Sequence, residues 1–314
     1  MLIFDCGKKK RAFHAVAFDP TGQILASGGD YQAVIVWDVA TGTERVRFAG
    51  FTHSAHALQF HPFSGQLLLL SSHGLQVCDV HSGATVTANM GKRYVGMPAF
   101  TQDQNWAVYS HTPEDRRSVL SAIVRFGEAD HAPIWSVPIG DTADESGYAT
   151  DLACLPGGEH FVSAEYVSGH HYRNSRRRIA IRSRADGSLL RSSPNNVLGY
   201  GHRVYGSHVS DALVVQDGIW LRIHSIDDLT APQFVVRNDG RKHFTGVAFH
   251  PSGRFLAATS NDETVKLYDT TTWEVARTFT WNIGRMRSIA FSPDGTLAAA
   301  GGDKGQVVVW DVDL

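Results

Sequence analysis

An internal repeat constrains the fold of this 314-residue chain more than any other feature of its sequence. Residues 15–39 read AVAFDPTGQILASGGDYQAVIVWDV, and residues 288–312 read SIAFSPDGTLAAAGGDKGQVVVWDV; residues 246–270 and 57–80 follow the same pattern. Trp37 and Cys78, at the same place in successive units, are 41 residues apart, and Tyr268 and Trp310 are 42 apart. A repeat of this length indicates one structural unit used several times, each copy burying a face against the next.

Each unit predicts four short antiparallel strands. The first strand ends at a phenylalanine, and a Pro/Gly turn follows it, as in FDPTG at 18–22 and FSPDG at 291–295. Proline presets the backbone angle φ that the second turn position needs, and glycine suits the end of the turn. The third strand alternates, so that Val34 and Val36 share one face. Four strands in about 40–45 residues are typical of one blade of a β-propeller.

The units resemble the WD40 repeat family. The Trp-Asp pair for which that family is named stands at 37–38 and 310–311, with relaxed forms at 268–269 and 78–79. The aspartate of the tight turn before the third strand recurs as well. The positions to which the resemblance assigns a structural role are Asp30, Trp37, Asp38, Asp79, Asp262, Tyr268, Asp269, Asp303, Trp310 and Asp311. The family's Gly-His pair is nearly absent, so we expect its His-Ser-Asp-Trp hydrogen-bond network to be incomplete in most units.

Seven units are predicted, which gives an all-β, seven-bladed propeller of four-stranded antiparallel blades in a single domain, residues 1–314. Four units match well, and the three central ones are degenerate. The blades are expected at about 12–50, 51–90, 91–140, 145–196, 197–240, 243–281 and 284–314. The last unit ends without a fourth strand, and the segment MLIFDC at about 1–6 belongs to no unit. The resemblance implies that this N-terminal strand pairs with the last blade and closes the ring, which hides open sheet edges.

Composition narrows the class of protein. Basic residues number 29 and acidic residues 31, a net charge of −2, whereas a dedicated nucleic-acid-binding protein carries a basic excess. No apolar run is long enough to span a membrane, and MLIFDCGKKKR lacks the order of a secretory signal. Cys6, Cys78 and Cys154 are too widely spaced for a disulfide framework or a metal pair. We therefore expect a cytoplasmic protein.

Arginine, histidine and tyrosine recur in the loops between blades and between second and third strands. In the WD40 family these loops lie on the face around the narrow end of the central channel, where partners bind. Arginine and tyrosine are enriched at interaction hot spots, although loops are polar for solvation alone. The predicted partner-binding residues are Arg11, Arg93, Tyr94, Arg116, Arg117, Tyr148, His170, His171, Tyr172, Arg173, Arg176, Arg203, Tyr205, Lys242, Phe244, Arg285 and Arg287.

The densest basic stretch is HHYRNSRRR at 170–178. It resembles a nucleic-acid-binding patch, yet it continues as RRRIAIRSR into the predicted third strand of the fourth unit. There Ile179 and Ile181 take the places of Val34 and Val36, and Arg182 takes the place of a tryptophan. We expect a long loop, residues 167–177, that runs into a core strand, and not a free basic arm.

Catalytic and metal-binding motifs are missing from the sequence. It holds no P-loop, no G-x-S-x-G and no G-x-G-x-x-G, and its 16 histidines form no set at metal-ligand spacing. We expect no metal and no cofactor. The predicted function is a non-catalytic scaffold, monomeric on its own, that binds a protein or peptide partner of acidic character, and neither a membrane nor nucleic acid. Two alternatives stay open: a hydrolase- or lactonase-like propeller enzyme with a site at the channel mouth, and a binder of RNA or phospho-ligands.

Overall fold

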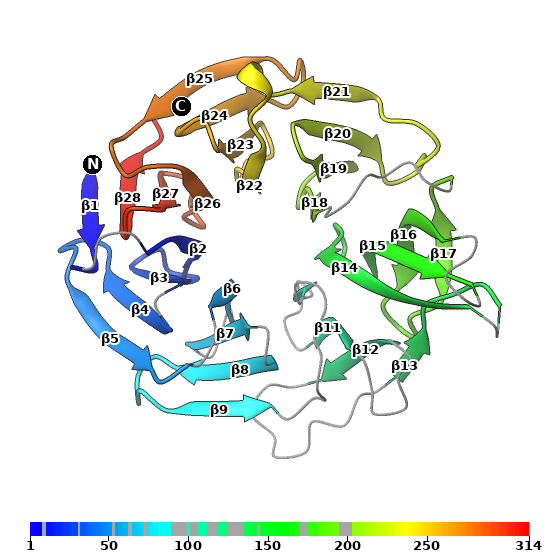
Figure 1. The fold of residues 1–314 in the computed structure, drawn as a ribbon, viewed down its shortest axis with the longest axis horizontal. Helices are drawn as coiled ribbons and strands as arrows, with labels where there is room; N and C mark the ends of the chain where they lie inside the picture. Colours follow the sequence, from blue (N-terminus) through cyan, green and yellow to red (C-terminus); the bar gives the residue numbers. More distant parts are fainter. Residues whose placement is uncertain are drawn as a thin grey trace. The chain divides into compact units, whose positions relative to one another are not determined.

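The computed structural model describes residues 1–7, 11–30, 32–51, 54–61, 65–71, 74–88, 99–100, 106–111, 119–124, 135–142, 145–169, 175–194 and 203–313. In these ranges the chain is all-β, as predicted, and the one helical element is a 3-10 turn, η2, at Asp239–Arg241. The strands form four-stranded antiparallel sheets (Figure 1). The chain divides into two compact units, residues 1–87 with 238–314, and residues 88–237.

The first unit holds four sheets. The first sheet is β2 Phe13–Phe18, β3 Ile24–Gly29, β4 Ala33–Asp38 and β5 Glu44–Ala49. The second is β6 Ala55–Phe60, β7 Gln66–Ser71, β8 Gly74–Asp79 and β9 Thr85–Ala88. The third is β22 Phe244–Phe249, β23 Phe255–Ser260, β24 Thr264–Asp269 and β25 Val275–Thr280. The fourth is β26 Met286–Phe291, β27 Leu297–Gly302, β28 Gln306–Asp311 and β1 Leu2–Asp5.

The fourth sheet joins the two ends of the chain. β1 pairs antiparallel with β28, with Leu2 opposite Val309, and Figure 1 shows the two strands side by side. Phe4 of β1 is buried, and its ring centroid lies 5.4 Å from that of Trp37 in the first sheet. The predicted pairing of the N-terminal strand with the last blade is confirmed, and it covers the edge of β28 that would otherwise be open.

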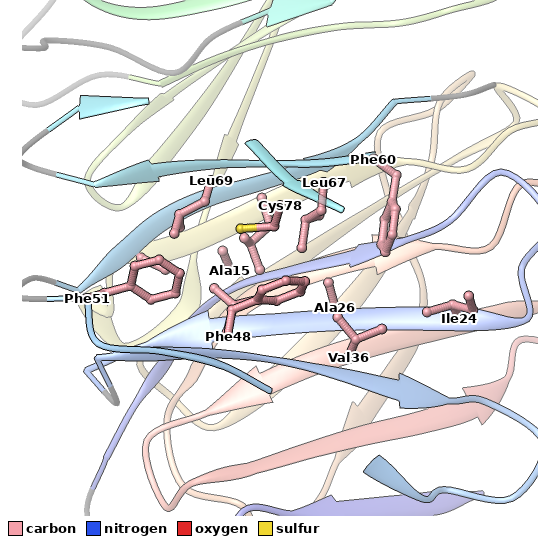
Figure 2. Packing of buried hydrophobic residues seen from close by; sticks show 13 residues of the cluster. Ala15, Ile24, Ala26, Val36, Phe48, Phe51, Phe60, Leu67, Leu69 and Cys78 are labelled. Carbon is pink, nitrogen blue, oxygen red and sulfur yellow. The ribbon is translucent and has the colours of Figure 1, made fainter. Parts of the chain in front are cut away.

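Apolar side chains between neighbouring sheets form the core. Figure 2 shows the cluster between the first and second sheets, where Val36 and Phe48 pack near Leu67, Leu69 and Cys78. Alternation along β4 explains how one strand serves two interfaces. Its residues at 34 and 36 belong to this cluster, whereas those at 35 and 37 pack with β1 and the fourth sheet.

The second unit holds three further sheets. One is β10 Ala99–Phe100, β11 Trp106–His111, β12 Val119–Val124 and β13 Trp135–Pro138. The next is β14 Ser146–Cys154, β15 His160–Ser168, β16 Arg176–Ser183 and β17 Leu189–Ser192. The last is β18 Arg203–Gly206, β19 Ala212–Asp217, β20 Trp220–Ser225 and β21 Phe234–Arg237.

The predicted count of seven full blades needs correction. The described ranges contain seven four-stranded sheets, but six of them are complete blades with a first strand of four to nine residues. The sheet at 99–138 begins with a two-residue strand, whose Ala99 pairs with Val108 and whose Phe100 pairs with Ala107. The sequence after that strand is TQDQN, without the proline and glycine that fix the turn elsewhere, so the repeat pattern does not define a full first strand here.

Candidate functional site

The sheet β14–β17 is longer than the first sheet at one end. Its strands β14 and β15 have nine residues each and β16 has eight, whereas β2, β3 and β4 have six. The β-bulge between Ala149 and Asp151 corresponds to the one between Phe13 and Ala15. Residues 146–148, 166–168 and 176–177 are therefore additions to the regular blade, and we call them the blade extension.

Three side chains line up across one face of the blade extension. Tyr148 lies opposite Tyr166, and Tyr166 lies opposite Arg177. The two tyrosine ring centroids are 5.2 Å apart, and the Arg177 Cζ lies 5.4 Å from the centroid of the Tyr166 ring. All three side chains are partly exposed. Directly opposed strand positions favour such aromatic and cation–π contacts. We call these residues the tyrosine–arginine row.

The opposite face of the blade extension is fixed to the segment that precedes β14. Val167 is buried in a cluster with Ile139. Gly147 permits this close approach, because a Cβ at that position would lie 2.4 Å from the Tyr166 carbonyl oxygen and 2.8 Å from Ile139 Cγ2. Arg176 binds Glu145, and it also pairs with Asp141 at 2.7 Å. One face of the extension is thus anchored, and the other presents the tyrosine–arginine row.

A buried ion-pair network lies next to the blade extension, where β15 and β16 enter the regular blade. The Glu165 side chain, 0% exposed, accepts hydrogen bonds from Arg178 Nε at 2.9 Å and Arg182 Nε at 2.6 Å. The hydroxyl of Ser163 donates to the same carboxylate at 2.7 Å, and Arg178 Nη1 donates to Asp141 at 2.7 Å. Burial acts to raise the pKa of Glu165, but Arg182 and Arg178 outweigh it and hold that pKa below its usual value. The carboxylate therefore stays ionised inside the sheet.

The ion pair of Arg176 with Glu145, at the outer end of the network, also stays charged. The hydrogen bond from Arg176 lowers the pKa of Glu145 to about 2, so this pair stays charged throughout the physiological pH range. Arg178 is almost fully buried, and its Nη2 has no hydrogen-bond partner among the described residues. Two arginines of the stretch RRR at 176–178 are therefore bound to carboxylates of the protein itself.

The pairing register confirms the predicted place of Arg182. It lies opposite Phe161, as Trp37 lies opposite Leu25 in the first sheet. Ile179 and Ile181 are buried, as predicted for core positions. The basic stretch thus ends in an interior strand. The predicted loop is shorter than expected, because β15 continues to residue 168 and β16 begins at residue 176.

A second polar cluster lies in the first unit. Asp30 Oδ1 is 2.9 Å from His14 Nε2 and 3.1 Å from Ser54 Oγ, and Arg11 donates to the Asp30 main-chain oxygen. Burial acts to raise the pKa of Asp30, but the bonds from His14 and Ser54 outweigh it, and the net shift is downward. The serine is bonded to the carboxylate and not to the imidazole, so this trio is not a serine nucleophile with its base.

The repeat aspartates close turns. Their carboxylates accept main-chain N–H groups two or three residues farther along the chain, which fixes the turn after the third strand or the tight turn before it. The pairs are Asp38 with Thr41, Asp79 with Ser82, Asp262 with Thr264, Asp269 with Thr271, and Asp311 with Asp313. Asp303 accepts instead from the N–H of Arg285.

The predicted binding residues are divided between the two units. Tyr148, Arg176, Arg203 and Tyr205 lie in the second unit, on β14, β16 and β18. Arg11, Lys242 and Arg285 are exposed in the first unit, where Arg287 donates to Asn261 and Phe244 is buried. The remaining predictions lie outside the described residues: Arg93, Tyr94, Arg116, Arg117, His170, His171, Tyr172 and Arg173.

Tyr166 was not predicted as a binding residue, and Arg177 was expected only as the last residue of the loop at 167–177 on the binding face. Their alignment with Tyr148 depends on the pairing register of three strands, and residues 167–177 were interpreted as a loop. Among the residues that the structure describes, no three His, Cys, Asp or Glu side chains gather as metal ligands. Within the same residues, no helix has the length and apolar character needed to cross a bilayer.

Three segments of the chain match the family model described as WD domain, G-beta repeat: residues 7–38, 236–269 and 273–311. These segments contain most of the first, third and fourth sheets of the first unit. Repeats and sheets together show a β-propeller protein of the WD40 repeat class.

Two curated proteins are similar to this chain. A 57-residue stretch is 46% identical to Transducin beta-like protein 3 of Bos taurus and covers 18% of this chain and 7% of that protein. An alignment of 311 residues with Protein tipD of Dictyostelium discoideum shows 22% identity and covers 95% of this chain and 39% of that protein. The chain thus spans well under half of the length of these curated relatives.

Proposed function

We propose that this protein is a non-catalytic scaffold for a protein or peptide partner, and that the tyrosine–arginine row forms part of its binding surface. The observation that carries the proposal is the blade extension itself. The corresponding strands of the first sheet end where the extension begins, so its residues add a surface beyond the regular blade.

Physical properties of the row support this role. Tyrosine and arginine dominate interaction hot spots, and tyrosine loses little conformational entropy on binding because it has two side-chain torsions. The ion pairs of Glu165 and Arg176 hold the three strands in one arrangement, and a surface ordered in advance binds more tightly than one ordered on binding. Proteins of the WD40 class are generally non-catalytic interaction scaffolds. Acidic character of the partner, a monomeric state and a cytoplasmic location are our further expectations.

The test is affinity capture from an extract of the native host with matched variants. The double variant Tyr148→Ala/Tyr166→Ala removes the rings of the row. The control Leu189→Ala/Leu190→Ala removes two side chains from β17 of the same sheet, which are 39% and 52% exposed. We expect a partner that binds the wild type and the control to be lost from the double variant at equal folded fraction. Equal retention by all three proteins would exclude the row as the binding surface.

A further inference from the structure

We infer that the partner segment contains proline in the polyproline II conformation, and that Trp220 on the neighbouring sheet completes its binding surface. The inference rests on the proposed function, because it takes the tyrosine–arginine row as one half of that surface and adds the chemistry of the partner. It follows from the pairing register of the sheets β14–β17 and β18–β21, which lie side by side in the second unit (Figure 1).

The tyrosine–arginine row lies on the face of β14–β17 that packs against β18–β21. Tyr166 is opposite Arg177, and strand alternation puts Ala164, two residues before Tyr166, on the same face. Ala164 is buried in the cluster that joins this sheet to β18–β21 through Leu213 and Val215. The row therefore continues, beyond the core, the face that β14–β17 turns toward β18–β21.

Trp220 continues the facing side of β18–β21 in the same direction. It pairs with Asp217 where β19 ends and β20 begins, and Asp217 lies two positions along β19 from the core residue Val215. The row likewise lies where β15 ends and β16 begins. Trp220 is partly exposed, and the Cζ of Arg237, opposite it on β21, lies 5.4 Å from the centroid of its ring. Two neighbouring sheets thus end in the same combination of aromatic rings with a stacked arginine.

The side chains at this end of the two faces offer aromatic surfaces and hydrogen-bond donors. Arginine and the tryptophan indole only donate, and a tyrosine hydroxyl can donate. Among the described residues of the two faces, the carboxylates are Asp151 and Asp217, and both have partners within the protein. Asp151 accepts from the N–H of Val204, and Asp217 pairs with Arg222 at 3.5 Å. A complementary ligand therefore has carbonyl acceptors, compact apolar rings and few N–H groups. A proline-rich chain has these properties, because proline lacks the N–H and a polyproline II helix makes no internal hydrogen bonds.

The repeat of a polyproline II helix matches the spacing of the two sheets. The helix has three residues per turn and rises about 3.1 Å per residue, so that residues i and i+3 lie on one side about 9 Å apart. Sheets that pack face to face are about 10 Å apart. A proline on the rings of Tyr148 and Tyr166 therefore places a second proline, three positions away, on Trp220. The spacing predicts a P-x-x-P segment, whose conformation is set before binding and costs little entropy.

The test uses a phage library of random dodecapeptides, selected on the full-length wild-type protein. We expect enriched peptides to carry two prolines three positions apart. Synthetic copies, measured by fluorescence anisotropy, should bind Trp220→Ala and Tyr148→Ala/Tyr166→Ala about tenfold more weakly at equal folded fraction. Replacing both prolines of the peptide by alanine should weaken binding as much, because it adds N–H groups and frees the backbone. The matched control Phe234→Ala removes a ring that is 42% exposed on the other face of β18–β21, and it should behave as the wild type.

The outcomes separate this inference from the proposed function. Peptides that need both tyrosines but lack proline, and bind Trp220→Ala as well as the wild type, would overturn the inference and leave the row as a binding surface. Peptides that bind Tyr148→Ala/Tyr166→Ala undiminished, or no enrichment at all, would overturn both. Trp220→Phe keeps an aromatic ring and should retain most of the binding. An oligouridine RNA assayed in parallel should not bind at physiological salt; binding that requires Trp220 would replace the peptide by a nucleic acid.

Discussion

The sheets β2–β5 and β14–β17 share a pairing register, yet their interiors use different chemistry. In β2–β5 the indole of Trp37 fills the interior and donates one hydrogen bond of 2.8 Å to Ser27. In β14–β17 Arg182 stands in place of the tryptophan, Ser163 in place of Ser27, and Glu165 in place of Gly29. One blade is thus held by an apolar ring with a single polar contact, and the other by paired charges.

This difference shows what the repeat requires of its interior positions. The backbone pairing is the same in both sheets, so the strands do not depend on tryptophan as such. A charged side chain can take the same place when a buried carboxylate pairs with it, as Glu165 does with Arg182. Paired charges tolerate substitution less well than the tryptophan does, because the free-energy cost of burying them is offset only while every partner is present.

The largest expected effect is that of Glu165→Gln. The substitution keeps the shape of the side chain, leaves Arg182 buried without the charge of Glu165, and leaves Arg178 with Asp141 as its remaining ion-pair partner. Breaking a buried pair on one side costs about 3–5 kcal/mol, and we expect a loss of that size in the free energy of unfolding, measured by urea titration.

A matched triple variant separates charge pairing from packing. Replacing Glu165, Arg178 and Arg182 together by leucine removes all three charges, and such replacements cost far less than single ones. If Glu165→Gln destabilised the protein by less than about 1 kcal/mol, the network would not be the support of this blade.

In β2–β5 the equivalent change is Ser27→Ala. It removes the acceptor of the Trp37 Nε1–H, which then stays buried without a partner at a cost of about 1–3 kcal/mol. Thermal unfolding of the two variants side by side compares the blades directly. A cost equal to that of Glu165→Gln would mean that both interiors are equally intolerant, contrary to our comparison.

In the sheet β18–β21, His224 takes the place of the tryptophan. It has neither the hydrogen bond of Trp37 nor the ion pair of Arg182. It is fully buried, and both ring nitrogens have no hydrogen-bond partner among the described residues. Burying an unbonded polar group costs about 1–3 kcal/mol, so His224→Leu should stabilise the protein by roughly 1–2 kcal/mol, again by urea titration.

The stability of the wild type should also depend on pH through this histidine. Burial, and then the charge of Arg222, lower the pKa of His224 in the folded state, whereas its unfolded value is about 6.5. The unfolded chain then binds more protons, so stability falls as the pH drops below about 6.5. The leucine variant should lack this component; an identical pH slope in both proteins would refute the assignment.

The smallest effect is expected at Ala300→Ser in the fourth sheet. Ala300 is at the place of Ser27, and the Trp310 Nε1–H is buried without a partner among the described residues. A serine supplies the acceptor present in β2–β5 and should add about 0.5–1.5 kcal/mol to the free energy of unfolding. Phenylalanine has no N–H to donate. In a protein that carries Trp310→Phe, Ala300→Ser should therefore add nothing to the free energy of unfolding.

Local signals made most strands predictable from the sequence. The Pro/Gly turns and alternating third strands fixed the blades at 15–39, 246–270 and 288–312, and placed Arg182 in the interior. In the blade at 91–140, Phe100 was expected to end a full first strand, but that strand has two residues, and TQDQN after it lacks the Pro/Gly turn signal.

The candidate site was predictable only in part. Tyr148 and Arg176 were identified by residue type and loop position, but Tyr166 and Arg177 join the row through cross-strand register. The ion pairs are similarly non-local, since Asp141 and Arg178 are 37 residues apart in the chain. Residue composition therefore indicated a charged surface where the structure places charges that largely neutralise each other.

The joint between β1 and β28 has a mechanical consequence. The strands are antiparallel, with Leu2 opposite Val309 and Asp5 opposite Gln306, so both chain ends leave the sheet on the same side. A load applied between those ends pulls on one residue pair after another, beginning at Leu2, and peels the strands apart. It never shears all four pairs at once. The terminal strand should thus detach under low force, and a tether at both ends would open the fourth sheet first.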